Sequence, residues 1–332
     1  MANALEVLRT TAVVLAIAVM AAGAAPAQDA KTNPLQSIVR VYVEVPADAR
    51  SAQGLGRQRL GSGTVIDDSG LIITIGYVIM EAMSILVTDG AGKPVPAEVV
   101  GYDYESGLGL VRAVRPLGIK PMAIGDSTKL AEGEAVIVAD FRGAEGAIAA
   151  RVASRREFAG YWEYLLDDAL FTSPPHPNWG GAALIGLDGK LYGVGSLLVN
   201  DAKGEKQSDP GNMFVPINLL KPIFAELLAD GRRNAPPKPW LGLFSAEHQG
   251  RVVVTWVSPD SPAAKAGLQP GDFIVSLKGT KIGGVSDFYR KLWGSGNAGI
   301  PVPLGVLRDG EARDIVVESA DRYKFMRWHK SY

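Results

Sequence analysis

The sequence predicts a mainly β protein with two domains, a larger all-β barrel or sandwich followed by a small α+β domain. The chain has 332 residues, which is enough for two domains of ordinary size. Between residues 34 and 229, short strand-like segments alternate with glycine turns, and few stretches have helical periodicity. Residues 232–239 contain three prolines, so we expect an extended linker between the two domains.

The first 27 residues have the pattern of a secretory signal. Arg9 precedes an apolar run over residues 11–22, and an Ala-Pro-Ala pattern follows at residues 25–27. The apolar run is too short to span a bilayer. We therefore expect a signal peptide over residues 1–27 and a mature protein in the periplasm. The alternative is an uncleaved anchor that holds the same domains at the membrane.

Strand patterns fill the first domain, residues 28–231. Apolar and polar residues alternate with period two over residues 37–45, which predicts a strand. A turn at residues 67–70 joins segments 63–66 and 71–74 in a predicted hairpin. Further strands are expected at residues 97–102, 109–114, 135–139 and 190–198.

Helical patterns are short and few. Apolar residues at three-to-four spacing predict a helix over residues 216–230, and Gly231 is its expected stop. The second domain, residues 240–320, has two short helical segments, the second of them over residues 286–293. Strands are expected in this domain at residues 251–257, 273–277 and 302–307. This mixture predicts a small α+β domain.

The charge balance and the side-chain inventory exclude several classes of function. Lys plus Arg number 34 and Asp plus Glu 35, so nothing marks the chain as a general binder of nucleic acid. The chain has no cysteine, which excludes disulfides, thiolate nucleophiles and thiolate metal sites. Its three histidines, His176, His248 and His329, lie in separate regions. We therefore expect neither a metal site nor a cofactor.

Two motifs of the second domain resemble a PDZ domain of the bacterial type. They are Trp-Leu-Gly-Leu-Phe at residues 240–244 and Ser-Pro-Ala-Ala-Lys-Ala-Gly-Leu-Gln-Pro-Gly-Asp at residues 261–272. A PDZ groove adds an extended peptide as a strand and holds its terminal carboxylate with loop N–H groups. The resemblance implies a peptide-binding loop and a groove-lining helix formed by Leu241, Gly242, Leu243, Phe244, Phe288 and Leu292. The alternative is that these are core residues, above all the two loop leucines.

The first domain resembles the trypsin-like domain of HtrA/DegP-type serine proteases. The matching segments are residues 61–66, 125–127, 178–181, 188–194 and 215–218. The likeness spans essentially the whole mature chain and keeps the family's order, a protease domain followed by a PDZ domain. It implies a trypsin-like double β-barrel, in which each barrel has six strands.

The resemblance breaks at the three positions that carry the family's chemistry. Tyr77 stands where the family has its general-base histidine, and a phenol with a pKa of roughly 10 cannot replace imidazole at neutral pH. Gly107 stands in place of the orienting aspartate. Trp179 stands in place of the nucleophilic serine, and its indole cannot attack a carbonyl. We therefore predict no catalytic residue at these positions, and we expect Trp179 to fill part of the former cleft.

Neighbouring residues bear on this prediction. Pro177 replaces a glycine of the loop whose N–H groups face the substrate in the family. Ser173 and His176 allow a relocated Ser-His pair, but a proline-rich surface loop with solvated polar side chains is the favoured interpretation. Asp167 and Asp168 are expected to be turn or capping carboxylates.

We interpret the chain as an exported, catalytically inactive pseudoprotease that binds proteins or peptide C-termini through its PDZ domain, as scaffold, adaptor or regulator. Two alternatives stay open: an active envelope serine endopeptidase with an unrecognised nucleophile, and a structural assembly subunit with a vestigial groove. A second copy of the chain is a further candidate partner. The basic and aromatic tail, residues 321–332, either contacts an acidic partner, a membrane surface or another subunit, or forms an exposed end.

Overall fold

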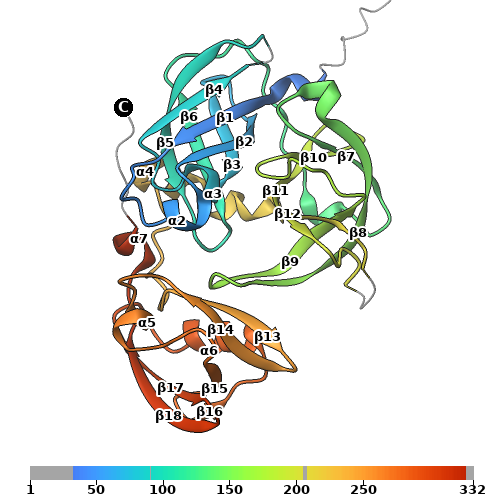
Figure 1. The fold of residues 1–332 in the computed structure, drawn as a ribbon. Coiled ribbons are helices and arrows are strands. Elements are labelled where there is room, and N and C mark those ends of the chain that lie inside the picture. Colours follow the sequence, from blue (N-terminus) through green and yellow to red (C-terminus); the bar gives the residue numbers. More distant parts are fainter. Residues whose placement is uncertain (1–32, 90, 205–207, 327–332) are drawn as a thin grey trace, which may run out of the picture. The chain divides into compact units, whose positions relative to one another are not determined.

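Strands β1 to β6 close into an antiparallel barrel (Figure 1). The computed structural model describes residues 33–89, 91–204 and 208–326, so the predicted signal peptide lies outside the described residues. Hydrogen-bonded neighbours follow the order β1-β2-β3-β6-β5-β4. The strands are β1 (Ile38–Glu44), β2 (Gln58–Val65), β3 (Leu71–Ile75), β4 (Ser84–Thr88), β5 (Pro94–Tyr102) and β6 (Leu108–Ala113). The predicted hairpin between β2 and β3 is confirmed by their antiparallel pairing.

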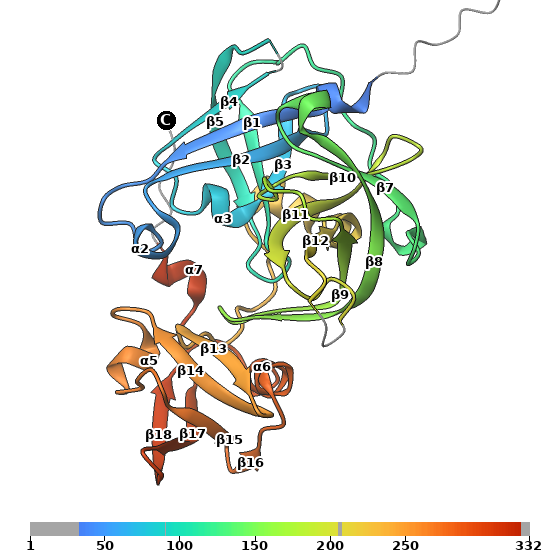
Figure 2. The ribbon, with the colours of Figure 1, turned by 45° about the vertical axis from the view of Figure 1, so that its right-hand side comes forward.

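Strands β7 to β12 form a second closed barrel, which the turned view of Figure 2 also shows. The order is β10-β11-β12-β9-β8-β7. The strands are β7 (Ala135–Ala139), β8 (Ala147–Gly160), β9 (Tyr164–Ser173), β10 (Ala183–Gly186), β11 (Leu191–Val199) and β12 (Gly211–Pro216). The double barrel that the resemblance implied is therefore confirmed. β8 and β9 are longer than their neighbours, and they stay paired up to Gly160 and Tyr164 at the tip of a hairpin.

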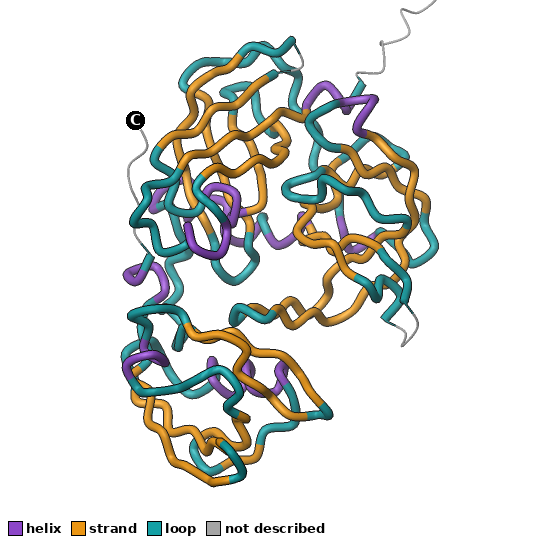
Figure 3. The backbone as a smooth tube through the Cα atoms, in the orientation of Figure 1, coloured by secondary structure: helices purple, strands orange, loops and turns teal. Residues whose placement is uncertain are grey.

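The helices of the first domain are short, and Figure 3 shows that strands and loops make up most of the backbone. They are η1 (Pro34–Ser37), α2 (Ala52–Leu55), α3 (Gly76–Ile79), η2 (Ser127–Lys129) and η3 (Gly143–Gly146). The continuous helix predicted over residues 216–230 is wrong in its first half. Two 3-10 turns, η4 (Ile217–Leu219) and η5 (Lys221–Ile223), precede α4 (Phe224–Asp230). Pro222 has no backbone N–H to continue a helix, whereas Gly231 ends α4 in the left-handed conformation, as expected.

The second domain is a sheet with two helices. The sheet order is β13-β14-β15-β17-β18, and β16 pairs with β15. The strands are β13 (Leu243–His248), β14 (Arg251–Val257), β15 (Phe273–Leu277), β16 (Thr280–Lys281), β17 (Pro301–Arg308) and β18 (Glu311–Glu318). Helix α5 (Pro262–Lys265) begins at a Ser261 cap, and helix α6 (Val285–Trp293) matches the predicted segment. This confirms the predicted α+β domain.

Ion pairs and aromatic contacts attach the linker and the tail to the first domain. Arg233 of the linker donates to both carboxylate oxygens of the buried Asp103, at 3.1 and 2.9 Å. Beyond the sheet, α7 (Arg322–Phe325) places the Tyr323 hydroxyl 3.1 Å from the Tyr102 carbonyl oxygen, to which it donates. Arg50 lies over the ring of Phe325 at 3.8 Å. The first part of the tail thus contacts its own chain, while residues 327–332 lie outside the described residues.

Candidate functional site

Tyr77 lies on α3, the single helical turn that follows β3. Its hydroxyl donates a hydrogen bond of 2.9 Å to the carbonyl oxygen of Ser196. Burial raises the pKa of the Tyr77 phenol well above its ordinary value, and the nearby Trp179 side chain only partly opposes this shift. Tyr77 therefore keeps its proton at neutral pH and holds it toward a carbonyl oxygen.

Gly107 lies in the turn directly before β6, with a positive φ of 77°. Its carbonyl oxygen accepts a hydrogen bond of 2.7 Å from Gly76, which joins this turn to the start of α3. A Cβ atom at position 107 would lie 3.2 Å from the hydroxyl oxygen of Tyr164. A carboxylate-bearing residue at this position would therefore meet both backbone strain and the tyrosine.

Trp179 lies in the loop between β9 and β10 and is half-buried. Its carbonyl oxygen accepts a hydrogen bond of 3.0 Å from Ala182. The loop is packed so closely that a Cβ atom on Gly181 would lie 2.0 Å from the Ser62 carbonyl oxygen. Pro177, two residues before Trp179, has no N–H group and cannot serve as a backbone donor to a developing oxyanion.

The structure brings these three positions together. Tyr77, Gly107 and Trp179 line one cavity of about 1160 Å³. The same cavity is lined by Tyr161 and Trp162 of the β8–β9 hairpin and by aromatic residues of the second domain and the tail, Phe244, Trp256 and Phe325. Trp179 thus lines the cavity without closing it. An aromatic wall remains at the place where the family resemblance puts the catalytic groups.

His176 is buried, so the expected loop of solvated polar side chains is wrong at this position. Its Nδ1 accepts a hydrogen bond from the Asn178 backbone N–H at 3.1 Å. This assigns the ring proton to Nε2, which lies 2.9 Å from the Gly146 carbonyl oxygen and donates to it. Ser173 donates instead to the Pro210 carbonyl oxygen at 3.4 Å. Because both ring nitrogens of His176 are engaged, they are not available to activate a serine.

The loop predicted to hold a peptide carboxylate already holds one. Glu163, at the tip of the β8–β9 hairpin, places Oε1 2.6 Å from the Gly242 nitrogen and 3.1 Å from the Leu243 nitrogen. Its Oε2 lies 3.0 Å from the Leu241 nitrogen. Glu163 is 4% exposed, and burial raises its pKa to about 7 while the three N–H donors act against this rise. The loop geometry is therefore that of a carboxylate-binding nest.

The backbone of the same hairpin tip pairs with the second domain. The Ser245 N–H of β13 donates to the Tyr161 carbonyl oxygen at 2.8 Å. The hydroxyl of Tyr289 on α6 donates to the Gly160 carbonyl oxygen at 2.9 Å and accepts from the Glu163 N–H at 3.2 Å. The hairpin tip thus lies between β13 and α6, which are the two walls of a PDZ groove.

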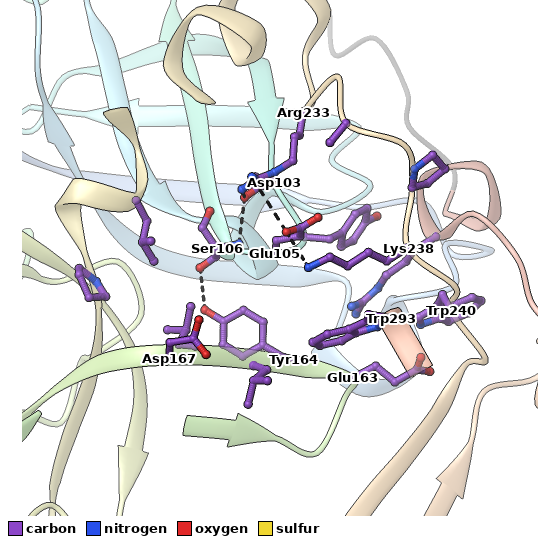
Figure 4. A pocket seen from close by; sticks show the side chains of 18 of the residues that line it. Asp103, Glu105, Ser106, Glu163, Tyr164, Asp167, Arg233, Lys238, Trp240 and Trp293 are labelled. Atoms are coloured by element: carbon purple, nitrogen blue, oxygen red, sulfur yellow. Dashed lines mark hydrogen bonds and ion pairs between the residues drawn. The ribbon is translucent and has the colours of Figure 1, made fainter. Parts of the chain in front are cut away.

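The residue after Glu163 connects the hairpin to the Gly107 turn. The Tyr164 hydroxyl donates to the Ser106 carbonyl oxygen at 2.6 Å, and Figure 4 shows this contact beside Asp103 and Glu105. Lys238 of the linker pairs with Glu105 at 2.9 Å. Both Glu163 and Tyr164 line a smaller cavity of about 430 Å³ together with linker residues.

The structure places the six predicted peptide-binding residues in one region, but most are buried. Leu241, Leu243, Phe288 and Leu292 belong to the apolar core of the second domain, so the alternative interpretation as core residues holds for their side chains. Ala159 and Leu165 of the hairpin pack against that core. Phe244 remains half-buried, with its ring 5.7 Å from that of Tyr161.

Asp167 and Asp168 are strand residues of β9, so the prediction of turn or capping carboxylates is wrong. Asp167 pairs with Arg290 of α6, and Asp168 with Arg155 of β8. Within the described ranges, no three His, Asp or Glu side chains gather in a way that could hold a metal ion. None of the helices described is long and apolar enough to cross a membrane.

Comparisons with known proteins give the same two domains. A model of the trypsin-like peptidase domain matches residues 61–194, and a model of the PDZ domain matches residues 239–318. The chain has the domain composition of an HtrA/DegP-type protease. Its fold is also similar to that of the HtrA-type protease AlgW, solved with a tripeptide and with a decapeptide. In each case the TM-score is 0.50 at 20% identity over 87% of this chain, and the match covers 94% and 98% of those chains.

Curated HtrA/DegP-type relatives cover most of the chain. A probable periplasmic serine protease do/HhoA-like of Haemophilus influenzae is 30% identical over 77% of this chain and 57% of its own length. The periplasmic serine endoprotease DegP of Escherichia coli is 27% identical over 81% of this chain and 59% of its own length. The serine protease Do-like HtrA of Bacillus subtilis is 29% identical over 76% and 61%. The chain therefore spans about three fifths of the length of these relatives.

Sequence reasoning missed Glu163 and the hairpin that carries it. The segment Gly-Tyr-Trp-Glu-Tyr at residues 160–164 has an acid beside three aromatic residues, but this pattern is not specific to any site.

Proposed function

We propose that this HtrA/DegP-type chain is catalytically inactive and binds protein segments that carry a carboxylate. One observation carries the proposal: Tyr77, Gly107 and Trp179 line the same cavity and offer no nucleophile with an adjacent base. The Tyr77 phenol is directed at a carbonyl oxygen, and its raised pKa keeps it protonated. The side chains of Gly107 and Trp179 supply neither a nucleophile nor a general base.

The surroundings argue against a rebuilt triad. His176 has both ring nitrogens in hydrogen bonds to the backbone. Pro177 removes one backbone donor from the loop that stabilises the oxyanion in trypsin-like enzymes. Catalysis by this family needs both a base and an oxyanion site, so two independent defects support inactivity.

The second domain supports a binding role. Three backbone N–H groups at Leu241, Gly242 and Leu243 converge on the carboxylate of Glu163. A peptide C-terminus presents the same chemical group, and strand addition along β13 would supply its backbone contacts. The PDZ family model and the periplasmic relatives support a function as scaffold, adaptor or regulator in the periplasm.

A specific observation also favours the second candidate, a structural subunit with a vestigial groove. The hairpin tip fills the groove, and Leu243 and Phe288 are almost fully buried. A groove used only as an internal docking surface would look the same. The two candidates differ in whether an external peptide can enter.

Inactivity is tested by labelling the purified mature protein with a fluorophosphonate probe and by casein digestion. We expect no label on any serine and no cleavage under conditions in which DegP of Escherichia coli is labelled and cleaves. Cleavage by the wild-type protein that disappears when one labelled serine is replaced would establish the active endopeptidase instead.

A further inference from the structure

We propose that the tip of the β8–β9 hairpin, residues 157–168, is an internal ligand of the PDZ domain. An external peptide that ends in a carboxylate must displace Glu163 before it can bind. This inference rests on the proposed binding function and adds its regulation: the chain holds its own groove closed. The hairpin tip is the occupant because it supplies both features that a PDZ groove recognises, a carboxylate and an extended backbone.

The first part is the carboxylate. Oε1 and Oε2 of Glu163 together accept from three successive backbone nitrogens, at 3.0 Å (Leu241), 2.6 Å (Gly242) and 3.1 Å (Leu243). Three converging N–H groups in a left-handed turn at Gly242, φ 81°, form an anion site. Because all three N–H groups donate to Glu163, a second carboxylate can use them only after Glu163 leaves the nest.

The second part is the backbone. The Tyr161 carbonyl oxygen accepts from the Ser245 N–H of β13, two residues past the carboxylate loop. This is the contact expected of a strand added to the edge of the sheet. On the other wall, the Tyr289 hydroxyl contacts the Gly160 carbonyl oxygen and the Glu163 nitrogen. The hairpin tip therefore occupies backbone positions as well as the anion site.

The backbone conformation of Glu163 indicates that its side chain has a specific role at this position. The hairpin turn spans residues 161–163, and Glu163 has a φ of 55°. Glycine is the residue that adopts such a conformation without strain. A glutamate here is explained by the three N–H groups that its side chain satisfies.

Ion pairs outside the groove hold the hairpin tip in place without filling the nest. Arg290 of α6 contacts both Glu157 and Asp167 at 2.5 Å. These groups are largely exposed, so they orient the hairpin without taking part in peptide recognition. An incoming peptide therefore competes chiefly with Glu163 and with the Tyr161 backbone.

The test compares full-length mature variants. Glu163→Ala removes the internal carboxylate, and Tyr289→Phe removes the hydroxyl that holds the hairpin backbone while keeping the ring. Asp168→Ala is the matched control, because Asp168 is an exposed acid of the same hairpin and its ion-pair partner, Arg155, belongs to β8 of the first domain. Two readouts are taken: hydrogen exchange at residues 241–243, and binding of fluorescent decapeptides that end in free or amidated apolar residues.

We expect faster exchange at residues 241–243 in Glu163→Ala and Tyr289→Phe, with Asp168→Ala unchanged. Since an apparent Kd scales inversely with the open fraction, we expect both variants to bind the free-carboxylate peptides roughly tenfold or more tightly than wild type does. Amidated peptides should not gain. If Glu163→Ala fails to fold, Tyr289→Phe still decides the outcome.

Three results separate this inference from the proposed function. Unchanged exchange together with tight binding of free-carboxylate peptides by the wild-type protein overturns the internal ligand and leaves the proposed function standing. Faster exchange without binding of any peptide supports the internal ligand and overturns the binding function in favour of the structural subunit. Equal gains in Asp168→Ala would show a general effect of charge and overturn the assignment to Glu163.

Discussion

The Glu163 carboxylate oxygen and the Gly242 backbone nitrogen lie 2.6 Å apart, although 79 residues separate them in the sequence. Glu163 belongs to the trypsin-like domain and Gly242 to the PDZ domain. Through this contact, the carboxylate-binding loop of the PDZ domain packs against the trypsin-like domain.

Docking of the hairpin tip should weaken as the pH rises. Burial raises the pKa of Glu163 to about 7 in the docked state, from an ordinary value of 4.5. A docked state with the higher pKa binds more protons, so docking is strongest below about pH 4.5 and weakens as the pH rises toward about 7. The facing groups are Tyr289 of α6, whose phenol pKa is raised by burial so that it stays protonated in this window, and the guanidinium of Arg322 of α7.

The measurement is the affinity of the wild-type protein for free-carboxylate peptides between about pH 5 and about pH 8. We expect affinity to increase with pH in the wild type and to stay nearly constant in Glu163→Ala. Parallel pH profiles in the two proteins would show that another group titrates.

Restoring the three family residues should not restore proteolysis. The variant Tyr77→His/Gly107→Asp/Trp179→Ser lacks a donor at Pro177, and its aspartate would need the positive φ that Gly107 adopts. We expect casein cleavage at background level, checked by gel and by fluorophosphonate labelling. Activity comparable to that of a DegP-type enzyme would contradict both arguments.

Gly107 should be less tolerant of a side chain than a glycine with a similar backbone and open space. Gly107→Ala meets the Tyr164 hydroxyl at 3.2 Å, whereas nothing lies within 4 Å of the Cβ position of Gly118, whose φ is 65°. We expect Gly118→Ala to lower the free energy of unfolding by about 1 kcal/mol and Gly107→Ala by more. Urea denaturation measures both, and equal losses would assign the whole effect to the backbone.

Asp103 should be one of the most sensitive charged residues. It is fully buried, and its ion pair with Arg233 and the hydrogen bonds from Ser106 lower its pKa against the opposing effect of burial. Asp103→Ala leaves Arg233 without its partner, and we expect a loss of about 3 kcal/mol in the free energy of unfolding. Glu311→Ala, in an exposed pair with Arg313, is the control and should cost less than about 1 kcal/mol.

Most of the fold could be predicted because strand periodicity and glycine turns are local signals. β7 and β15 begin and end at the predicted residues, and helix α6 lies within one residue of its predicted range. The helix predicted over residues 216–230 was too long because the helical spacing of apolar side chains continues through Pro222. Proline has no backbone N–H, so it interrupts the helical hydrogen bonds without changing the spacing of the side chains. Local signals thus gave the elements but overlooked one interruption.

The site could be predicted only in part. The motif positions of Tyr77, Gly107 and Trp179 were available from the sequence, and the structure gathers them around one cavity. The burial of His176 depends on Asn212 and Gly146, which lie 36 and 30 residues away. Glu163 depends on a partner loop still farther along the chain. Side chains that act through such distant contacts leave no periodic pattern in the sequence.

Glu163 is the last residue of the hairpin turn, and Tyr164 is the first residue of β9. One of them holds the PDZ loop, and the other donates to Ser106 beside the Gly107 turn. If a peptide displaces Glu163, we expect the neighbouring Tyr164 to shift as well, and Tyr164 also lines the aromatic cavity. Because such coupling is reciprocal, a molecule that binds in that cavity would in turn change the affinity of the hairpin tip for the PDZ groove. The hairpin tip would then couple two sites, the PDZ groove and the aromatic cavity that Tyr77, Gly107 and Trp179 line.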